Sequence, residues 1–581
     1  MTINEKDFED FIFIQSLENA ILFNGKSNPK AILGKCISNF PEIKKEMQTY
    51  IKKINNIVQQ VNNFSLDEQK IKLKKLNPSF FEKKLKQKKE KKNELIDLPD
   101  LEGEFIGRFA PAPSGYLHIG HALNIIYNSE YKKKYGGKLI IRFEDTNPEK
   151  INIKNYEKIL EDINWLSENA VDEVFYQSER VSTYYKYLRQ LVETGNAYIC
   201  DCEVEKFKLF NDSSKPCPHR NLAINIQLEK YEYFFNGKYK DGDAVIRFKA
   251  DLENKNPALR DFPIARLNST PHARVGTKYK LWPMYNFAVS IDDSLMGINY
   301  IIRGKDAEIG AIRQDMIKEK LGLKKSKYYH FGLVQFTDIE LGKTPIKKKI
   351  DEGIYSGWDD PRVPTLISFR KRGFKPKAFR DMIVSFGISK RGYKLSEKEY
   401  YKSLNYFNKQ ILEKESDRYF FVLNPKLVEI QNHNNYPEKE ITLPRHPDFK
   451  DRGNRKFNLE NKYYIDGIDF NNIEEGELIR LMHFGNFKVI KKTNEKLILN
   501  FESKNYDKTL KIKRNIHFIP YKETEQRKVK IIMQDASIIK GLCEILNNPK
   551  VDDSIQFERF GFVRYDGKNE EGEKVFYFTH R

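Results

Sequence analysis

The first hundred residues carry apolar side chains at helical spacing. In Ser16-Leu-Glu-Asn-Ala-Ile-Leu-Phe23, apolar residues recur on one face, which favours an amphipathic helix. A lysine-rich stretch, Glu82–Lys92, follows, and after it comes the acidic, proline-containing piece Asp97–Asp100. We therefore predict a helical N-terminal domain over residues 1–100.

The pattern changes at residue 104, where a strand, a helix and a second strand follow in turn. Glu104–Phe109 is β-branched and aromatic, Leu117–Tyr131 has helical periodicity, and Lys138–Phe143 is nearly all apolar. Gly136 and Gly137 stand where the helix should end. A strand buried on both faces is a continuous apolar run, and strand–helix–strand units build parallel nucleotide-binding sheets. These residues predict the start of an α/β, Rossmann-like domain.

Two amphipathic helices come next, and the pattern then loses its rhythm. Their apolar faces comprise Tyr156, Leu160 and Ile163, then Tyr184, Leu188 and Leu191. Ser182 or Thr183 is the candidate N-cap of the second helix. From Cys200 to about residue 280 the pattern is irregular, and the α/β rhythm resumes at Tyr285. From about residue 416, short alternating strands and frequent turn signals predict all-β barrels.

Composition and charge narrow the class of protein. The 581 residues are 39% hydrophobic, enough for several domain cores, and 102 Lys and Arg against 82 Asp and Glu leave a net charge of +20. Such an excess indicates either a nucleic-acid partner or compositional drift. Likewise, Glu82–Lys92 is either a solvated helix or linker, which we favour, or an RNA contact. No apolar run reaches the ~18–20 residues of a membrane helix, the N-terminus is too acidic for a signal peptide, and five cysteines make no disulfide framework. We predict no membrane partner and a cytoplasmic location.

His118-Ile-Gly-His121 falls on the first turn of the helix after the first strand. A helix N-terminus offers free backbone N–H groups and a positive dipole end to an anion. Gly120 allows a nucleotide to approach the backbone, and both histidines can donate to phosphate oxygens. A His-x-x-His pair alone is more often a metal site or a surface pair. The preceding Pro113-Ser-Gly turn and its place between strand and helix favour phosphate binding.

Three segments resemble those of a known enzyme family. Arg108-Phe-Ala-Pro-Ala-Pro-Ser-Gly-Tyr-Leu-His-Ile-Gly-His-Ala122 resembles the HIGH signature of class I aminoacyl-tRNA synthetases, in the form of the glutamyl/glutaminyl branch. Arg142-Phe-Glu-Asp-Thr-Asn-Pro148 and Gly357-Trp-Asp-Asp-Pro-Arg-Val-Pro-Thr365 resemble the second and third signatures of that branch. The resemblance to archaeal/eukaryotic-type glutamyl-tRNA synthetases extends from about residue 16 to the C-terminus.

The resemblance implies a reaction and a domain order. Glutamate would attack the α-phosphate of ATP, with Mg²⁺ accompanying the nucleotide, and the glutamyl group would pass to the 3′ end of tRNA(Glu), with tRNA(Gln) as a second candidate partner. We expect a Rossmann-like catalytic domain over residues 101–330, with an acceptor-binding insertion at about 196–282. A helical connector over 331–415 and anticodon-binding β-barrels over 416–581 would follow.

The family's site residues transfer to this chain by motif. Pro113, Gly115, His118, Gly120 and His121 match the ATP site, and the two histidines would be catalytic. Glu340-Leu-Gly-Lys-Thr344 stands where the family has the mobile KMSKS loop. There Lys343 matches the catalytic second lysine, also an ATP ligand, whereas Glu340 replaces the first lysine and Gly342 the serine. The alternative is that Lys343 is an ordinary surface lysine.

Five residues match the glutamate site. They are Arg108, Ala110, Glu144, Tyr285 and Arg303. Glu144 ends a parallel strand, where such sheets bind ligands, and would face the substrate ammonium, while Arg108 would contact its carboxylate. Arg303 would pair with the γ-carboxylate by a bidentate, charge-assisted contact. Glutamine would leave that guanidinium unpaired. The alternative is a structural ion pair between Arg303 and Asp306.

Cys200, Cys202, Cys217 and His219 form a candidate zinc site. Three thiolates and an imidazole are a valid tetrahedral Zn²⁺ set, and the C-x-C…C-x-H pattern resembles a zinc knuckle of some glutamyl enzymes. The alternative is ordinary thiols. Cys36 and Cys543 are isolated, and we expect them in the core. The rival functions are a glutaminyl-tRNA synthetase, a non-catalytic tRNA-binding paralogue, and a tRNA-modifying relative, which would lack the C-terminal barrels.

Overall fold

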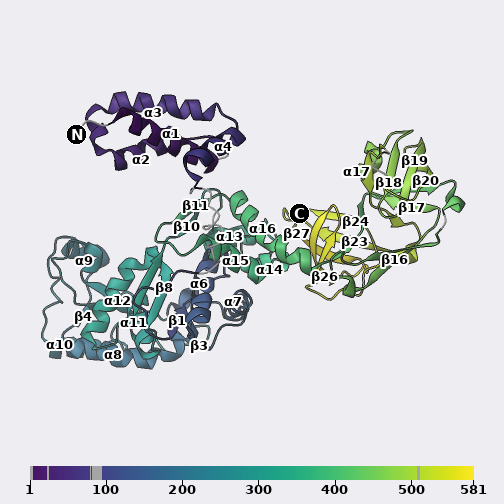
Figure 1. Cartoon of the computed structure of the whole chain (residues 1–581). Coiled ribbons are helices and arrows are strands. Elements are labelled where there is room, and N and C mark those ends of the chain that lie inside the picture. The colour runs from purple at the N-terminus through teal and green to yellow at the C-terminus, as the bar shows by residue number, and fades with distance from the viewer. Residues whose placement is uncertain are drawn as a thin grey trace. The chain divides into compact units, whose positions relative to one another are not determined.

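The computed structural model (Figure 1) describes residues 4–22, 25–78, 80, 95–339, 341–436, 438–506, 509 and 511–581. It separates the chain into two compact units, Met1–Glu94 and Leu95–Arg581. The lysine-rich stretch Glu82–Lys92 and the position of Glu340 lie outside the described residues.

The first unit is helical, as predicted. Its described helices are α1 (Glu5–Leu22), α2 (Pro29–Asn39), α3 (Met47–Asn62) and α4 (Leu66–Leu76). Phe8 and Ile12 of α1 pack with Ile54 and Val58 of α3 in the core of the unit, and the isolated Cys36 is buried there. A Ser65–Glu68 capping box begins α4, which satisfies backbone donors at that helix end.

The second unit begins with a parallel sheet whose strands are β1 (Phe105–Phe109), β2 (Gly137–Phe143), β3 (Glu173–Tyr176), β8 (Tyr300–Gly304) and β9 (Lys327–Phe331). β2 pairs with both β1 and β3, and β8 pairs with β9. Asn299 connects the group β1-β2-β3 to the pair β8-β9. The backbone N–H of Ile106 donates to the Asn299 side-chain oxygen, and the backbone N–H of Asn299 donates to the Ile106 carbonyl. The parallel order β3-β2-β1, with the parallel pair β8-β9 in contact with β1, confirms the Rossmann-like prediction.

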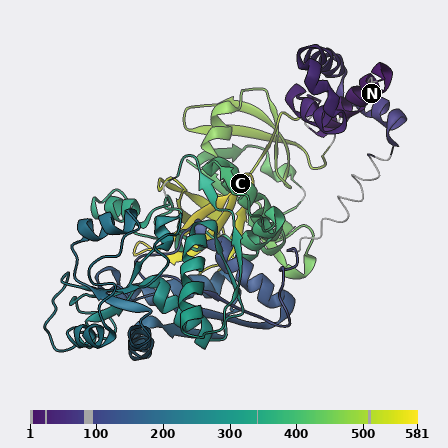
Figure 2. The ribbon, with the colours of Figure 1, turned by 90° about the vertical axis from the view of Figure 1, so that its left-hand side faces the viewer.

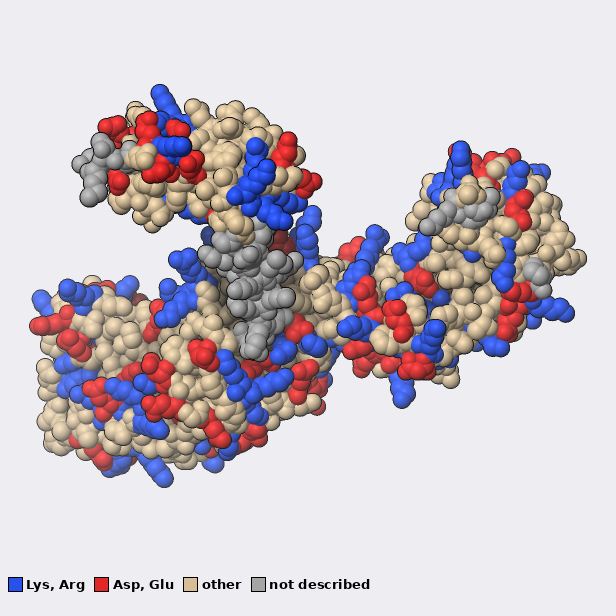
Figure 3. Space-filling view, viewed as in Figure 1, with Lys and Arg blue, Asp and Glu red and all other residues tan. Residues whose placement is uncertain are grey.

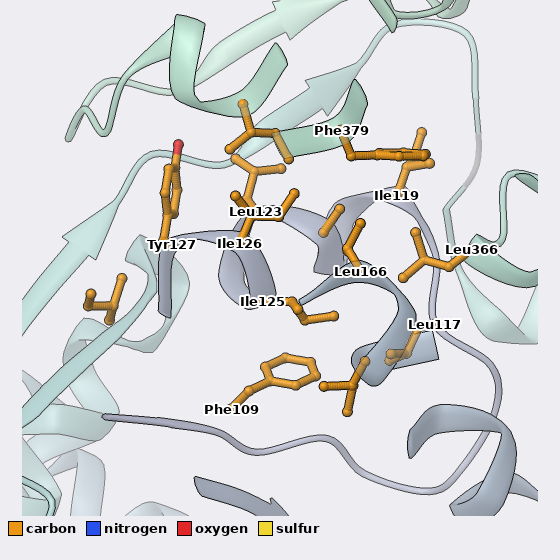
Figure 4. Packing of buried hydrophobic residues seen from close by; sticks show 14 of the residues in the cluster. Phe109, Leu117, Ile119, Leu123, Ile125, Ile126, Tyr127, Leu166, Leu366 and Phe379 are labelled. Atoms are coloured by element: carbon orange, nitrogen blue, oxygen red, sulfur yellow. The ribbon is translucent and has the colours of Figure 1, made fainter. Parts of the chain in front are cut away.

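Helices accompany this sheet, namely α6 (Ile119–Tyr135), α7 (Ile153–Leu166), α11 (Tyr285–Leu295) and α12 (Glu308–Lys320). Helix α8 (Val181–Glu193) packs with α11 and α12 in a separate core. Figure 4 shows α6 enclosed by apolar side chains, including Phe109 of β1 and Leu166 of α7. The proposed Ser182 or Thr183 cap is wrong, because a 3₁₀ turn, Gln177–Arg180, leads directly into α8 at Val181.

The stretch that looked irregular contains an antiparallel sheet. Its strands are β4 (Ala197–Cys200), β5 (Val245–Phe248), β6 (Phe262–Leu267) and β7 (Leu281–Pro283), accompanied by α9 (Val204–Asp212) and α10 (Ile224–Glu232). The strands pair in sequence order. Their short length, with polar helices between them, explains why the apolar pattern there shows no single period.

A mainly helical segment follows the parallel sheet. It comprises β10 (Val334–Phe336), α13 (Lys343–Asp351), α14 (Leu366–Lys371), α15 (Pro376–Phe386), β11 (Tyr393–Leu395) and α16 (Glu397–Glu415). Leu366 of α14 and Phe379 of α15 pack into the core around α6 (Figure 4). This segment therefore shares one core with the parallel sheet.

The C-terminal part is built of β-sheets, drawn in green and yellow in Figures 1 and 2. Over the described residues, one sheet has the order β12 (Asp417–Tyr419), β25 (Ser554–Phe557), β26 (Gly561–Lys568), β27 (Lys574–His580), β23 (Gln526–Ile532), β24 (Ile538–Glu544), β13 (Phe421–Leu423). The other has the order β21 (Arg514–Ile516), β18 (Leu478–Leu481), β19 (Gly485–Lys492), β20 (Lys496–Ser503), β14 (Lys426–Ile430), β17 (Lys462–Ile465), β22 (Ile519–Pro520).

Both of these sheets are curled toward closure. In each sheet the two edge strands are neighbours along the chain, since Phe420 alone separates β12 from β13 and two residues separate β21 from β22. Curling brings the edges together and leaves few exposed backbone groups. Near-barrel sheets agree with the prediction.

The hairpin β15 (Glu440–Pro444) and β16 (Asn454–Asn458) and the short helix α17 (Gly467–Asn472) accompany the two sheets. Cys543, on β24, is buried in the core of its sheet, as expected.

The positive charge is not gathered in one place on the face that Figure 3 shows, where Lys and Arg are interspersed with Asp and Glu. The net charge alone therefore marks no nucleic-acid surface there. No helix among the described residues is long and apolar enough to cross a membrane.

Candidate functional site

The first turn of α6 holds the two histidines side by side. His118 is the N-cap residue of α6, and the centroids of the His118 and His121 rings are 3.9 Å apart. The expected free amides are absent from this turn, because Ile119 donates to Pro364, Gly120 to the His118 ring and His121 to the His118 carbonyl. An anion here would meet histidine side chains and the helix dipole rather than free backbone N–H groups.

Hydrogen bonds from backbone N–H groups fix the tautomer of both imidazoles. Gly120 N–H donates to Nδ1 of His118, and His118 N–H donates to Nδ1 of His121, each at 3.1 Å. The hydrogen-bond network therefore assigns the ring proton of each neutral imidazole to Nε2. Burial, helped by the nearby Lys343 ammonium, lowers the pKa of His118 to about 4, and burial also lowers the pKa of His121. Both are neutral Nε2–H donors at pH 7.

The predicted catalytic lysine, Lys343, lies against the same loop. Lys343 begins α13, and its Nζ donates to Ser114 Oγ at 3.2 Å and to the Ala112 carbonyl at 3.3 Å. A Cβ on Gly115 would lie 2.9 Å from Lys343 Cδ, and one on Gly120 would lie 2.9 Å from His118 Cε1. Both glycines thus make room for neighbouring side chains. From the sequence we predicted instead that Gly120 allows a nucleotide to approach the backbone.

The three family-like segments meet here. The backbone N–H of Glu144, in the second segment, donates to the Pro111 carbonyl of the first at 3.0 Å. His118 and Thr365 form an antiparallel bridge, and the Leu366 amide donates to the Leu117 carbonyl at 2.9 Å. Tyr116 stacks on Trp358 with ring centroids 5.3 Å apart. Pro113 is buried, and its carbonyl accepts from the Asn155 side chain at 3.0 Å, which ties the loop to α7.

Two buried arginines share a carboxylate that sequence reasoning missed. Arg108 Nε donates to Asp293 Oδ1 at 3.3 Å, and Arg142 NH1 donates to the same oxygen at 2.6 Å. Burial alone would raise the pKa of Asp293, but the two guanidiniums hold it well below its usual range. Arg108 NH2 is buried without a hydrogen-bond partner. The sequence signal for Asp293 is an acidic pair, Asp292 and Asp293, inside the partly apolar helix α11.

Glu144 lies at the carboxyl end of β2. Arg142 NH2 lies 3.4 Å from its Oε1, and burial, offset in part by Arg142 and Arg108, raises the pKa of Glu144 to about 7. A cavity of about 270 Å³ is lined by Glu144, Ala112 and Tyr285 together with Arg266 and other residues of the antiparallel sheet. Ala110, half-buried, follows β1 directly.

Arg303 lies on β8 and is 4% exposed. Its guanidinium donates to Gln314 Oε1 at 3.0 Å and to the Tyr285 hydroxyl at 3.4 Å. Its Nε donates to His330 Nε2 at 3.5 Å. Within the described part of the chain, no carboxylate oxygen lies within 4 Å of Arg303, so the alternative of an ion pair with Asp306 is wrong. The Asp306 carboxylate instead lies beside Gly304, where an added Cβ would be 2.5 Å from Oδ1 of Asp306.

Cys200, Cys202, Cys217 and His219 come together as predicted. Their candidate ligand atoms all lie within 4.8 Å of one another. The Cys200 and Cys217 sulfurs are 3.9 Å apart, close to the roughly 3.8 Å that two thiolates about 2.3 Å from one tetrahedral zinc would have. Nδ1 of His219 faces Cys202 at 3.3 Å, while its Nε2 lies 2.6 Å from Asp201 Oδ1. That carboxylate is the usual orienting partner of a zinc-bound histidine.

Comparison with known proteins places these features in one family. The family model described as "tRNA synthetases class I (E and Q), catalytic domain" matches residues 105–414, and "tRNA synthetases class I (E and Q), anti-codon binding domain" matches residues 416–531. A glutamate–tRNA ligase of Methanocaldococcus jannaschii is 39% identical over 575 residues, 99% of this chain and 100% of that protein. A glutamate–tRNA ligase of Pyrococcus abyssi is 40% identical over 573 residues, which cover 96% of this chain and 97% of that protein.

Among solved structures, a glutamate tRNA ligase from Elizabethkingia meningosepticum, in complex with its amino acid, is 22% identical. The match covers 54% of this chain and 70% of that one, with a TM-score of 0.39. The full-length sequence identities and the two family-model matches show which family the chain belongs to. The chain belongs to the class I tRNA synthetases of the E and Q group and, within that group, to the glutamate–tRNA ligases.

Proposed function

We propose that this chain activates L-glutamate with ATP and transfers the glutamyl group to the 3′ end of tRNA(Glu). The observation that carries the choice of amino acid is the buried Arg303, whose described partners are all uncharged. A buried cation without a counter-ion is costly. The γ-carboxylate of glutamate would supply the missing anion through a bidentate contact, whereas the neutral amide of glutamine would not.

The remaining polar groups suit the rest of the amino acid. The Glu144 carboxylate would hold the substrate ammonium, and the free NH2 of Arg108 would hold the α-carboxylate. Asp293 orients the Arg108 guanidinium by accepting a hydrogen bond from its Nε. Tyr285 lines the cavity and accepts from Arg303, so it would border the side chain of the substrate.

The histidines and Lys343 would act on the phosphates. Glutamate would attack the α-phosphorus of ATP, the bond from that phosphorus to the bridging oxygen would break, and pyrophosphate would leave. No protein nucleophile is needed, so catalysis would come from positioning and from stabilising phosphoryl charge. His118 and His121 would donate through Nε2–H, and the Lys343 ammonium would neutralise the departing pyrophosphate.

Mg²⁺ would arrive bound to the ATP phosphates and would neutralise part of their charge. Of the described residues, the Cys200–His219 cluster is the one group of three or more His, Cys, Asp or Glu side chains close enough to hold a metal ion. It consists of thiolates and an imidazole, which suit zinc and not magnesium. We propose that it holds a structural Zn²⁺ that ties β4 to the following loop.

The tRNA would extend from the antiparallel sheet to the curled C-terminal sheets. The catalytic and anticodon-binding family matches meet near residue 415, and the insertion at β4–β7 borders the cavity that holds Glu144. We propose tRNA(Glu) as the acceptor, with tRNA(Gln) as the second candidate. With its five cysteines unpaired, the chain is proposed to work in a reducing cytoplasm.

Pyrophosphate exchange in the presence of tRNA tests this function. The wild-type protein should support exchange with glutamate, and Arg303→Met should lower kcat/KM for glutamate by roughly 100-fold or more, because it removes a charge-assisted, bidentate contact. Arg313→Met, on α12, is the control, because Arg313 donates to the Ala258 carbonyl, away from Arg303. Exchange that depends on glutamine and survives in Arg303→Met would overturn the proposal.

A further inference from the structure

The surroundings of Arg303 differ from those of the other buried arginines of the site. Arg142 lies within 4 Å of Asp293, Asp292 and Glu144, and Arg108 shares Asp293 with it. Arg303, in contrast, is held by neutral groups. The carboxylates of Asp292, Asp293 and Glu144 thus pair with Arg142 or Arg108, and none of them forms an ion pair with Arg303.

Gln314 is the principal support of that guanidinium. It lies on α12, is fully buried, and makes the shortest of the described Arg303 contacts, 3.0 Å from NH2 to Oε1. Its own Nε2 donates to Asn286 Oδ1 at 3.2 Å, which sets which end of the amide faces Arg303. The Arg303 guanidinium also lies 5.4 Å from the centre of the Tyr328 ring. Gln314 therefore orients Arg303 through NH2, while the Tyr285 hydroxyl accepts from NH1.

A glutamate at position 314 would have nearly the same shape but the opposite effect on charge. Its carboxylate would pair with Arg303 inside the protein and leave no net charge to attract the substrate's γ-carboxylate. Gln314 fixes the guanidinium without neutralising it. Asn286 could accommodate either residue, because rotation of its amide turns a donor toward position 314.

We propose that Gln314 is a specificity-determining positioning residue for glutamate, because its uncharged amide orients Arg303 while leaving that cation for the substrate. This inference rests on the proposed function, in which glutamate is the amino acid. It adds that selection depends on a neutral residue behind the arginine as well as on the arginine itself.

The test compares Gln314→Glu and Gln314→Met with wild type in tRNA charging, with KM measured separately for glutamate and for ATP. Gln314→Glu should raise KM for glutamate by roughly 10- to 100-fold, the value of a lost charge-assisted contact. KM for ATP should stay within about twofold. Gln314→Met removes one neutral hydrogen bond without adding charge, so its rise should be smaller, about two- to tenfold.

A second readout separates charge from folding. The thermal midpoint of Gln314→Glu should equal or exceed that of wild type, since the new ion pair compensates a buried cation. A purely structural role predicts instead that both variants lose stability and that KM for glutamate and for ATP rise together. That result, or a KM for glutamate in Gln314→Glu no higher than in Gln314→Met, overturns the inference. If wild type itself fails to charge glutamate, the proposed function falls, and this inference falls with it.

Discussion

The Lys343 ammonium donates a hydrogen bond to the Ser114 hydroxyl at 3.2 Å, although 229 residues separate the two along the chain. The contact holds the first turn of α13 over the loop between β1 and α6. Three cationic or hydrogen-donating side chains, from Lys343, His118 and His121, are thereby gathered at one helix end. This is the arrangement that stabilisation of a departing pyrophosphate requires.

Lys343 should give the reaction an alkaline limit. Burial lowers the pKa of Lys343 to about 8, and only the ammonium attracts phosphate. In wild type, kcat/KM for ATP should therefore fall as the pH rises above about 8. Lys343→Arg should lose this fall because its guanidinium stays protonated, and Lys343→Met should lower kcat by roughly 10²- to 10³-fold.

The control for Lys343 is the neighbouring Lys347. It pairs with Asp351 on the exposed face of α13, so Lys347→Met should leave the rate within about twofold. An unchanged alkaline fall in Lys343→Arg would assign that pKa to another group.

Glu144 should give an acid limit in glutamate binding. Its carboxylate must be ionised to hold an ammonium, and its pKa is raised to about 7 by burial. As the pH falls below about 7, the free protein takes up a proton there and kcat/KM for glutamate should fall, while the substrate ammonium stays charged. Glu144→Gln should be roughly 10- to 100-fold less active and lack this acid limb. Glu157→Gln, at an exposed position of α7, should behave as wild type. Persistence of the limb in Glu144→Gln would contradict the assignment.

Protein purified without added zinc should contain about one equivalent of the metal. Cys202→Ser should lose it and unfold at a lower temperature, because metal binding stabilises the folded ligand set. Cys36→Ala is the control, since Cys36 lies outside the cluster and should leave the metal content unchanged. Metal-free wild-type protein would show that the four side chains are ordinary thiols and an imidazole.

Local patterns were sufficient to predict the elements that position the proposed phosphate site. The apolar run of β2 and the glycines at 136 and 137 marked the end of one helix and the start of a strand, and the structure has both within two residues. His118 falls at the predicted helix start because capping depends on neighbours in sequence. Signals of this kind reach only a few residues along the chain.

Contacts between distant segments could not be predicted in the same way. Asp293 reaches Arg108 across 185 residues, and nothing near either residue in sequence indicates the pair. The amide of Ile119 is occupied by Pro364, which made the predicted free helix end wrong. Likewise, the Arg303–Asp306 alternative was attractive because the two residues are close in sequence, whereas the strand directs Arg303 toward Gln314 on the facing helix.

Charging of purified tRNA with labelled glutamate and labelled glutamine, side by side, tests the central claim most directly. The site predicts that glutamate is transferred and that glutamine is disfavoured by roughly 100-fold or more in kcat/KM, because only the γ-carboxylate compensates Arg303. Transfer of glutamine in preference to glutamate, or of neither amino acid to any tRNA, would contradict it.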